Sequence, residues 1–191
     1  MLTGVDHALE AASKRTYGSW LRFAVFKPDE CAQIIDGALK LPLETARVES
    51  GLRGVREGQV AWLERSSTFG WVFDRLEALA REYADEMAID IDELCDWMQF
   101  VKYEPGGRFD WHIDVGPGRG LRRKVTVCAQ LTDATAYDGG MLELVGEQSV
   151  LWRRAIGSAT VFPSILGHRL TPVTRGTRYA LVAWMLGPPY R

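Results

Sequence analysis

One stretch decides how this chain folds: QFVKYEPGGRFDWHID, residues 99–114. It joins two β-rich runs, 97–103 and 108–114, through a turn that contains Pro and two Gly residues. Alternate side chains of a strand share one face, so His112 and Asp114 are expected to point together. The pair predicts a platform for a metal ion. The alternative is an ordinary histidine beside a charge.

The same β-rich texture continues to the end of the chain. Gly and Pro residues divide it into the runs 97–103, 108–114, 124–131, 141–145, 149–152, 158–162, 167–173 and 178–185. So many short runs do not suit an α/β unit, and they predict a two-sheet roll or barrel.

The first half of the chain has a different pattern. A helix is expected from Pro28 to about Leu39, and a second over 69–87, because apolar residues recur in both at helical spacing. Short strands are expected at 20–26, 45–48 and 60–63, and the charged stretch 49–59 between the last two is expected to be a mobile loop.

The composition fits one domain. The 191 residues are 47% apolar and carry a net charge of −2, which argues against nucleic acid or a membrane as partner. Charge is uneven, with −7 over residues 1–96 and +5 over 97–191, so the second half favours an anionic ligand. Three cysteines and an N-terminus unlike a signal peptide predict a cytoplasmic location. We expect a single domain, 1–191, with a helix-rich support in 1–96 and the β-roll in 97–191.

The chain contains three histidines, of which His168 follows a predicted strand and is expected to return to the same end of the roll as His112. Two imidazoles and the carboxylate of Asp114 would leave metal positions open, which is typical of non-haem Fe(II) oxygenases. Hydrolytic zinc sites use the same ligand types. The ligands alone therefore do not choose between iron and zinc.

Arg178 bears on the choice between an iron and a zinc site. It begins a run of otherwise apolar alternation, and an arginine buried there needs an anion. A dicarboxylic cosubstrate would satisfy it, whereas the alternative is a carboxylate of the protein itself.

These motifs together resemble the Fe(II)- and 2-oxoglutarate-dependent dioxygenases of the prolyl-4-hydroxylase-like (PKHD-type) branch. The matching segments are residues 99–114, YDGGMLEL at 137–144, FPS at 162–164, HRLTPV at 168–173 and GTRY at 176–179. The resemblance implies a mainly β fold, a double-stranded β-helix (jelly roll, cupin-like) with an N-terminal α-helical buttress.

The resemblance also assigns roles. It implies that His112, Asp114 and His168 bind Fe(II) and that Arg178 binds the distal carboxylate of 2-oxoglutarate, with a hydrogen bond from Tyr103. Thr126 and Gln130 share one face of the run 124–131 and are also expected at the cosubstrate, although some relatives have a tyrosine where this chain has Gln130. The substrate pocket is expected to include Trp111, Trp184, Arg53, Arg56 and Glu57.

The implied activity is hydroxylation of a C–H bond with Fe(II), 2-oxoglutarate, O2 and, as reductant, ascorbate. A prolyl or other amino-acid residue in a peptide or protein is the expected substrate. The alternatives are a free amino acid, a small metabolite such as a siderophore or natural-product precursor, or a metal-binding roll without catalysis. Desaturation and cyclisation stay open, as does the oligomeric state.

Overall fold

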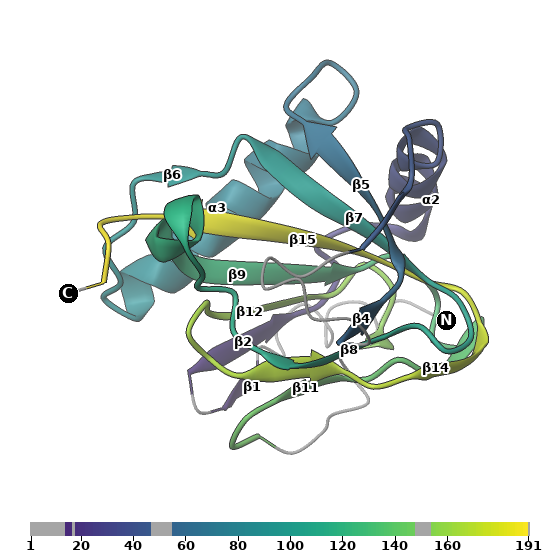
Figure 1. Ribbon diagram of the computed structural model, residues 1–191. Coiled ribbons are helices and arrows are strands. Elements are labelled where there is room, and N and C mark those ends of the chain that lie inside the picture. Colours follow the sequence, from purple (N-terminus) through teal and green to yellow (C-terminus); the bar gives the residue numbers. More distant parts are fainter. Residues whose placement is uncertain (1–13, 17, 47–54, 148–153, 191) are drawn as a thin grey trace, which may run out of the picture.

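The computed structural model describes residues 14–16, 18–46, 55–147 and 154–190. Within these ranges the chain is mainly β, with two α-helices, α2 (Pro28–Ala38) and α3 (Gly70–Glu86), and one 3-10 turn, η1 (Gly118–Arg122) (Figure 1). Neither helix is long and apolar enough to cross a bilayer.

The larger sheet has nine strands, and its neighbouring strands are antiparallel. Their order is β1 (Lys14–Thr16), β2 (Ser19–Arg22), β12 (Ala159–Pro163), β9 (Arg123–Gln130), β15 (Arg178–Leu186), β7 (Trp97–Tyr103), β5 (Gln59–Glu64) and β3 (Glu44–Thr45), with β6 (Glu93–Leu94) paired to the far end of β15. Strands from both halves of the sequence are therefore combined within one sheet.

A smaller sheet carries the two histidines of interest. Its order is β11 (Leu142–Leu144), β13 (His168–Leu170), β8 (Arg108–His112) and β4 (Arg56–Glu57), and a separate pair is formed by β10 (Tyr137–Gly139) and β14 (Val173–Gly176). His112 and His168 are direct register partners across β8 and β13. The pairing brings two residues far apart in sequence onto neighbouring backbones.

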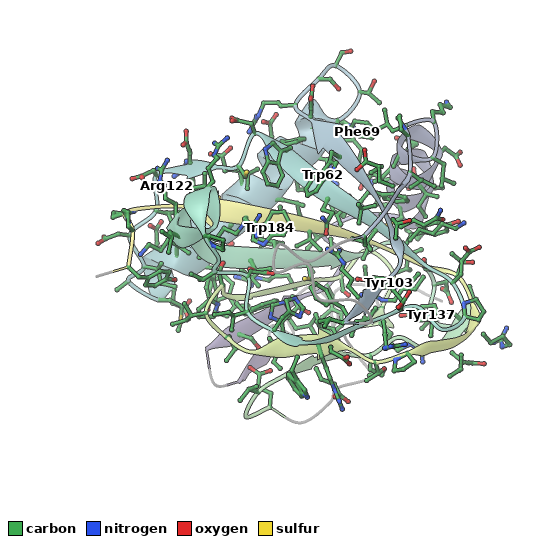
Figure 2. The ribbon with its side chains drawn as sticks, viewed as in Figure 1. Trp62, Phe69, Tyr103, Arg122, Tyr137 and Trp184 are labelled. Carbon is green, nitrogen blue, oxygen red and sulfur yellow. The ribbon has the colours of Figure 1, made fainter. Side chains whose placement is uncertain are left out.

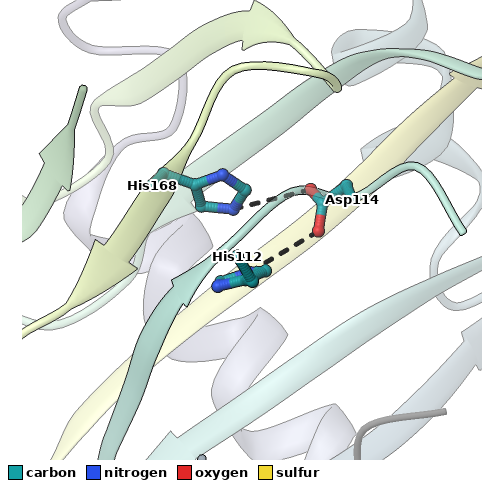
Figure 3. A group of neighbouring side chains, drawn as sticks. All are labelled: His112, Asp114 and His168. Atoms are coloured by element: carbon teal, nitrogen blue, oxygen red, sulfur yellow. Dashed lines mark ion pairs between the residues drawn. The ribbon is translucent and has the colours of Figure 1, made fainter. Parts of the chain in front are cut away.

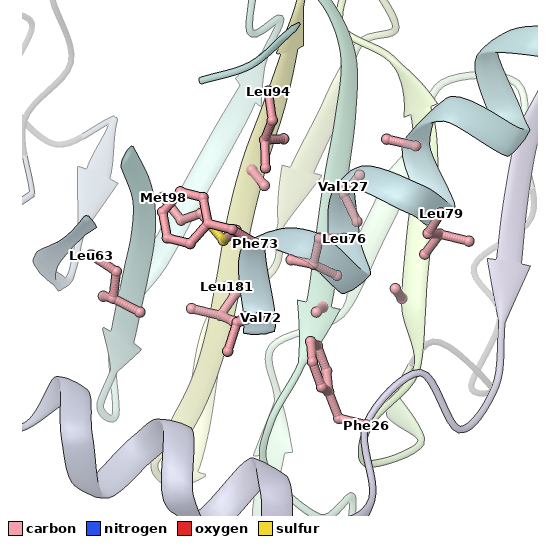
Figure 4. Close-up of a cluster of buried hydrophobic side chains, with 14 of the residues drawn as sticks. Phe26, Leu63, Val72, Phe73, Leu76, Leu79, Leu94, Met98, Val127 and Leu181 are labelled. Carbon is pink, nitrogen blue, oxygen red and sulfur yellow. The ribbon is translucent and has the colours of Figure 1, made fainter. Parts of the chain in front are cut away.

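Helix α3 covers one face of the larger sheet. Its apolar side, which includes Val72 and Leu76, packs against Val127 of β9, Leu181 of β15 and Met98 of β7 in one continuous core (Figure 4). The helical spacing of these apolar residues explains why this segment is a helix that buries one side. The opposite face of the sheet is left to form the site.

We expect Leu76→Ala to lower the free energy of unfolding by about 2–5 kcal/mol, because the removed methyl groups leave a cavity in this core. Leu76 is fully buried, whereas Leu39 at the end of α2 is 40% exposed. Leu39→Ala is therefore the control and should cost no more than about 0.5 kcal/mol. Urea denaturation measures both; equal losses would contradict the packing described here.

The structure confirms both expected helices and most expected strands, and it corrects three boundaries. The run expected over 108–114 ends at His112, so Asp114 lies beyond β8. The expected run 167–173 divides into β13 and β14 at Pro172, which has no N–H for a ladder hydrogen bond. The strand expected over 20–26 ends at Arg22. The short strand β10 was not expected at all. The expected run 149–152 lies outside the described residues.

The stretch 49–59 differs most from expectation. Residues 47–54 lie outside the described ranges, but Arg56 and Glu57 form strand β4 rather than a loop, because they pair with Phe109 and Arg108 of β8. Backbone hydrogen bonding to β8 thus fixes a segment whose charged sequence alone is typical of a solvated turn.

Candidate active site

A cavity of about 580 Å³ lies between the two sheets. The smaller sheet contributes His112 and His168, and the larger sheet contributes side chains such as Tyr103, Cys128 and Arg178. Its volume is within the usual range for small-molecule sites. The cavity brings candidate ligands to a metal and to a cosubstrate into one space.

His112, Asp114 and His168 converge at one end of this cavity (Figure 3). Each Asp114 carboxylate oxygen lies 3.7 Å from the Nε2 atom of one imidazole, Oδ1 from that of His112 and Oδ2 from that of His168. The backbone N–H of Asp114 donates to the carbonyl of Ser164 at 2.9 Å, which holds the residue after β8 in place. The three donor atoms lie within 4.8 Å of one another, so they can share one ion.

The backbone sets the tautomer of both imidazoles. Nδ1 of His112 lies 2.8 Å from the carbonyl of Asp110, and Nδ1 of His168 lies 2.9 Å from that of Leu166. A carbonyl only accepts, so each Nδ1 carries the proton and each Nε2 offers a lone pair. Both lone pairs are then free for a metal ion.

The ionisation of the triad suits metal binding. Burial and the neighbouring imidazole lower the pKa of His112 to about 4, so it is neutral at pH 7. Burial would raise the pKa of Asp114, but the two imidazoles and hydrogen bonds from Trp184 and Thr126 outweigh it and hold that pKa below its usual value. A neutral imidazole and an ionised carboxylate are the forms that bind metals.

The carboxylate of Asp114 is held from the larger sheet. Thr126 Oγ1 donates to Asp114 Oδ2 at 2.7 Å and lies 2.9 Å from Ser164 Oγ, and Trp184 Nε1 donates to the same Oδ2 at 3.0 Å. Thr126 was expected to contact the cosubstrate; the structure places it instead behind the candidate metal ligand. It is a positioning residue.

We expect Thr126→Val to weaken Fe(II) binding by roughly 10- to 100-fold, the usual cost of losing a hydrogen bond to a metal ligand. Thr160→Val is the matched control, since Thr160 is also buried and lies opposite Cys128 on the neighbouring strand β12. Metal titration monitored by tryptophan fluorescence compares the two variants. Equal affinities would mean that Thr126 does not position the carboxylate.

Arg178 lines the same cavity. It is 6% exposed and is the register partner of Tyr103, whose ring centroid lies 6.0 Å from the guanidinium carbon. Within the described residues it has no carboxylate partner, and its buried Nε has no hydrogen bond. Gly140, at φ +56°, leaves room for it, since a Cβ there would lie 3.1 Å from Arg178 Cδ. A buried, unpaired guanidinium favours an anionic ligand.

Only some of the other residues expected in the substrate pocket line the cavity. Trp111, Trp184 and Arg56 line the cavity, but Glu57 faces a shallower groove beside it. Gln130 is not among the lining residues, and its side-chain amide donates to the carbonyl of Thr132 at 2.9 Å. Arg53 lies outside the described residues.

Several residues that line the cavity were not predicted from the sequence. Gln99 and Trp97 alternate with Tyr103 along β7, so the period of two already placed them on its face. Arg123 belongs to a basic cluster whose sequence is typical of a solvated loop, yet it lines the cavity. No local pattern signalled this position for Arg123.

Known proteins similar to this chain identify its family. A family model described as the 2OG-Fe(II) oxygenase superfamily matches residues 98–186. A PKHD-type hydroxylase of Thermosynechococcus vestitus is 40% identical over 192 residues, which cover 97% of this chain and 78% of that protein. A PKHD-type hydroxylase of Delftia acidovorans is 30% identical over 175 residues, which cover 84% of this chain and 75% of that protein. The chain belongs to the 2OG-Fe(II) oxygenases, in their PKHD-type, prolyl-hydroxylase-like branch.

This oxygenase is accordingly a 2-oxoglutarate-dependent Fe(II) dioxygenase that uses O2. The family resolves the choice left open between iron and zinc, and it excludes a metal-binding roll without catalysis. The dioxygenase activity and the use of Fe(II), 2-oxoglutarate and O2 that the resemblance implied are confirmed.

Solved structures show the same fold. A Pseudomonas putida prolyl-4-hydroxylase superposes with a TM-score of 0.72 at 19% identity, covering 91% of this oxygenase and 94% of that chain. A Trichoplax adhaerens prolyl hydroxylase, in complex with a peptide fragment of the hypoxia inducible factor oxygen degradation domain, superposes with a TM-score of 0.74 at 17% identity, covering 90% and 84%. At such identities the likeness concerns the fold alone.

Proposed function

We propose that this oxygenase hydroxylates a prolyl residue of a peptide or protein, with His112, Asp114 and His168 as its Fe(II) ligands. The observation that carries the proposal is the presence, in one cavity, of a triad with two free Nε2 lone pairs and a buried guanidinium without a carboxylate partner among the described residues. A facial set of two imidazoles and one carboxylate suits Fe(II), and the guanidinium suits a dicarboxylic acid.

Iron with 2-oxoglutarate supplies the oxidising chemistry, in which O2 is consumed, the keto acid becomes succinate and carbon dioxide, and a C–H bond becomes C–OH. The protein's own role is binding and shielding. Arg178 binds the distal carboxylate of 2-oxoglutarate, and the hydroxyl of Tyr103 is the second donor. Trp184 and Trp111 shield the reacting centre from water, which prevents side reactions.

In the same proposal the two sheets that face each other across the cavity form a double-stranded β-helix. In this proposal residues 97–191 provide most strands of the roll and its candidate metal ligands. Residues 1–96 add further strands to both sheets and the two helices that support them, within one domain. Helix α3 stiffens the sheet that carries Arg178, because its core side chains pack behind that strand.

The substrate class rests on the relatives. Prolyl hydroxylases of 16–19% identity share the fold, and one of them is seen with a peptide. A mouth lined by Trp62 and Trp111, which are 41% and 47% exposed, suits a peptide segment. A free amino acid or a small metabolite is the second candidate, since a cavity of about 580 Å³ would hold it whole.

The test is a substrate screen with the purified protein, Fe(II) and 2-oxoglutarate. Proline-containing peptides, free amino acids and other metabolites are added in turn, and succinate and the oxygenated product are measured. We expect a prolyl peptide to raise succinate formation and to gain one oxygen atom. Stimulation by free amino acids but by no peptide would contradict the prolyl-peptide assignment, and the Zn(II)-loaded protein is the inactive control.

A further inference from the structure

The charges that line the cavity do not balance. Four arginines line it, Arg56, Arg123, Arg169 and Arg178, whereas Asp114 is the only carboxylate among the described lining residues. Arg178 is buried and the other three arginines are partly exposed, and a cleft lined by one sign of charge attracts ligands of the opposite sign. The excess of positive charge therefore favours an anionic ligand.

Two of the four arginines have an anionic partner, either observed or proposed. Arg169 Nε donates to Glu143 at 2.6 Å, and Arg178 is assigned to 2-oxoglutarate. Fe(II), the ionised Asp114, the dianion 2-oxoglutarate and Arg178 sum to zero charge. Arg56 and Arg123 are left over, and neither has a carboxylate partner within the described stretches of the chain.

Arg123 is held beside the candidate metal ligand. Its Nη1 donates to the backbone carbonyl of Asp114 at 3.2 Å, and its guanidinium carbon lies 4.1 Å from the ring centroid of Trp184 and 5.9 Å from that of Trp97. The rings of Trp97 and Trp62, with centroids 4.7 Å apart, continue this wall. Figure 2 labels Trp62 on β5 and Trp184 on β15. One hydrogen bond uses one of five donors, so the fork of Arg123 keeps donors for a ligand.

Arg56 lies beside the phenyl ring that stacks on His112. Its Nη2 donates to Gln99 Oε1 at 2.5 Å, and its guanidinium carbon lies 4.6 Å from the ring centroid of Phe109, which stacks on His112 with ring centroids 3.4 Å apart. Its Nε is buried and has no hydrogen-bond partner among the described residues. The two spare cations thus flank the triad, one on the side of Asp114 and one on the side of His112.

We propose that this oxygenase selects a substrate that carries a carboxylate, bound by Arg123 and Arg56 beside the tryptophan wall of Trp62, Trp97 and Trp184. The inference rests on the proposed function, because it takes Arg178 to be occupied by 2-oxoglutarate. The carboxylate belongs to an acidic side chain near the oxidised residue or to the α-carboxyl group of a terminal or free amino acid. Both sources present a carboxylate to the same two guanidinium groups.

Matched pairs of probes test the proposal by binding alone. One set consists of acetylated, amidated peptides with Glu or Gln on either side of a single proline. The other consists of acetyl-alanyl-proline with a free or amidated C-terminus, and of L-proline and L-prolinamide. Binding to the Zn(II)-loaded protein with 2-oxoglutarate is measured by calorimetry, so no turnover is required.

The acid of at least one pair is expected to bind roughly 10- to 100-fold more tightly than its amide, the usual value of hydrogen bonds to a charged group. Arg123→Gln and Arg56→Gln should each reduce that preference. Arg122→Gln is the matched control, since Arg122 adjoins Arg123 in sequence but pairs with Asp92 at 2.8 Å outside the cavity. The control should keep the full preference.

Acids and amides that behave alike in every pair, whether or not they bind, would overturn the proposal. So would a preference that survives in both variants. If Arg56→Gln instead weakened 2-oxoglutarate binding, Arg56 would belong to the cosubstrate site and its place in the proposal would be lost. Failure of the proposed function shows separately, as an absence of succinate formation in the substrate screen, and leaves the binding comparison readable.

Discussion

His168→Ala is expected to abolish 2-oxoglutarate-dependent oxidation and to remove tight Fe(II) binding. The imidazole is 4% exposed and presents Nε2 to the Asp114 carboxylate, so alanine deletes one of three candidate donors and no described side chain replaces it. The loss of iron affinity should exceed the roughly 10- to 100-fold that follows loss of an outer-shell partner. Metal titration and succinate formation measure the two effects.

The control for this variant is His7→Ala, because His7 is the one histidine of the sequence outside the triad. Circular dichroism and the thermal midpoint establish that the His168 variant is folded. The larger sheet and helix α3 hold the apolar core, so its fold should survive. An active, folded His168→Ala protein would refute the assignment of the metal site.

Arg178→Ala is expected to raise the 2-oxoglutarate concentration for half-maximal turnover by roughly 100-fold or more. Removing one partner of a buried ion pair costs about 3–5 kcal/mol, because the other charge is left in a low-dielectric site. Tyr103→Phe should cost less, roughly a tenfold change, since it deletes one hydrogen bond to a charged group. Titrations of 2-oxoglutarate compare the two variants.

Arg175→Ala is the control for the loss of an arginine, because Arg175 is exposed and pairs with Asp138 at 2.6 Å. Arg178→Lys restores the charge without the planar fork and should recover some of the affinity. Similar half-saturation values for the Arg178→Ala and Tyr103→Phe variants would mean that another cation, such as Arg56, holds the distal carboxylate.

The sequence predicted those elements of the fold that depend on local spacing. The apolar repeat from Pro28 and the repeat over 69–87 gave both helices within a few residues, and the run 97–103 coincides with β7. These patterns suffice because each element buries one face, and its period is set by backbone geometry. These local patterns could not predict that β4 pairs with β8, because the pairing of two strands depends on residues distant in sequence.

The candidate site likewise has features that the sequence predicted and features that only the tertiary structure decided. The sequence alone predicted that His112 and Asp114 lie close together, although Asp114 lies beyond the end of β8 and is held there by the backbone carbonyl of Ser164 rather than by strand alternation. It also identified His168 and Arg178 by residue type. The tertiary structure alone decided that His168 would lie directly opposite His112, because that depends on the register of β13 against β8.

Arg123 is the clearest case in which only the tertiary structure decided. Alternation from Thr126 and Cys128 would give Lys124, not Arg123, to the cavity face of β9. The pairing of β9 with β15 shifts register between Met185 and Leu186, and this irregularity reverses the alternation at the start of the strand. The extra residue is in β9, between Arg123 and Val125, and such a bulge turns the side chains beyond it to the other face. The sequence thus determined which chemistry the chain carries, while pairing between distant strands determined which arginines face the candidate metal site.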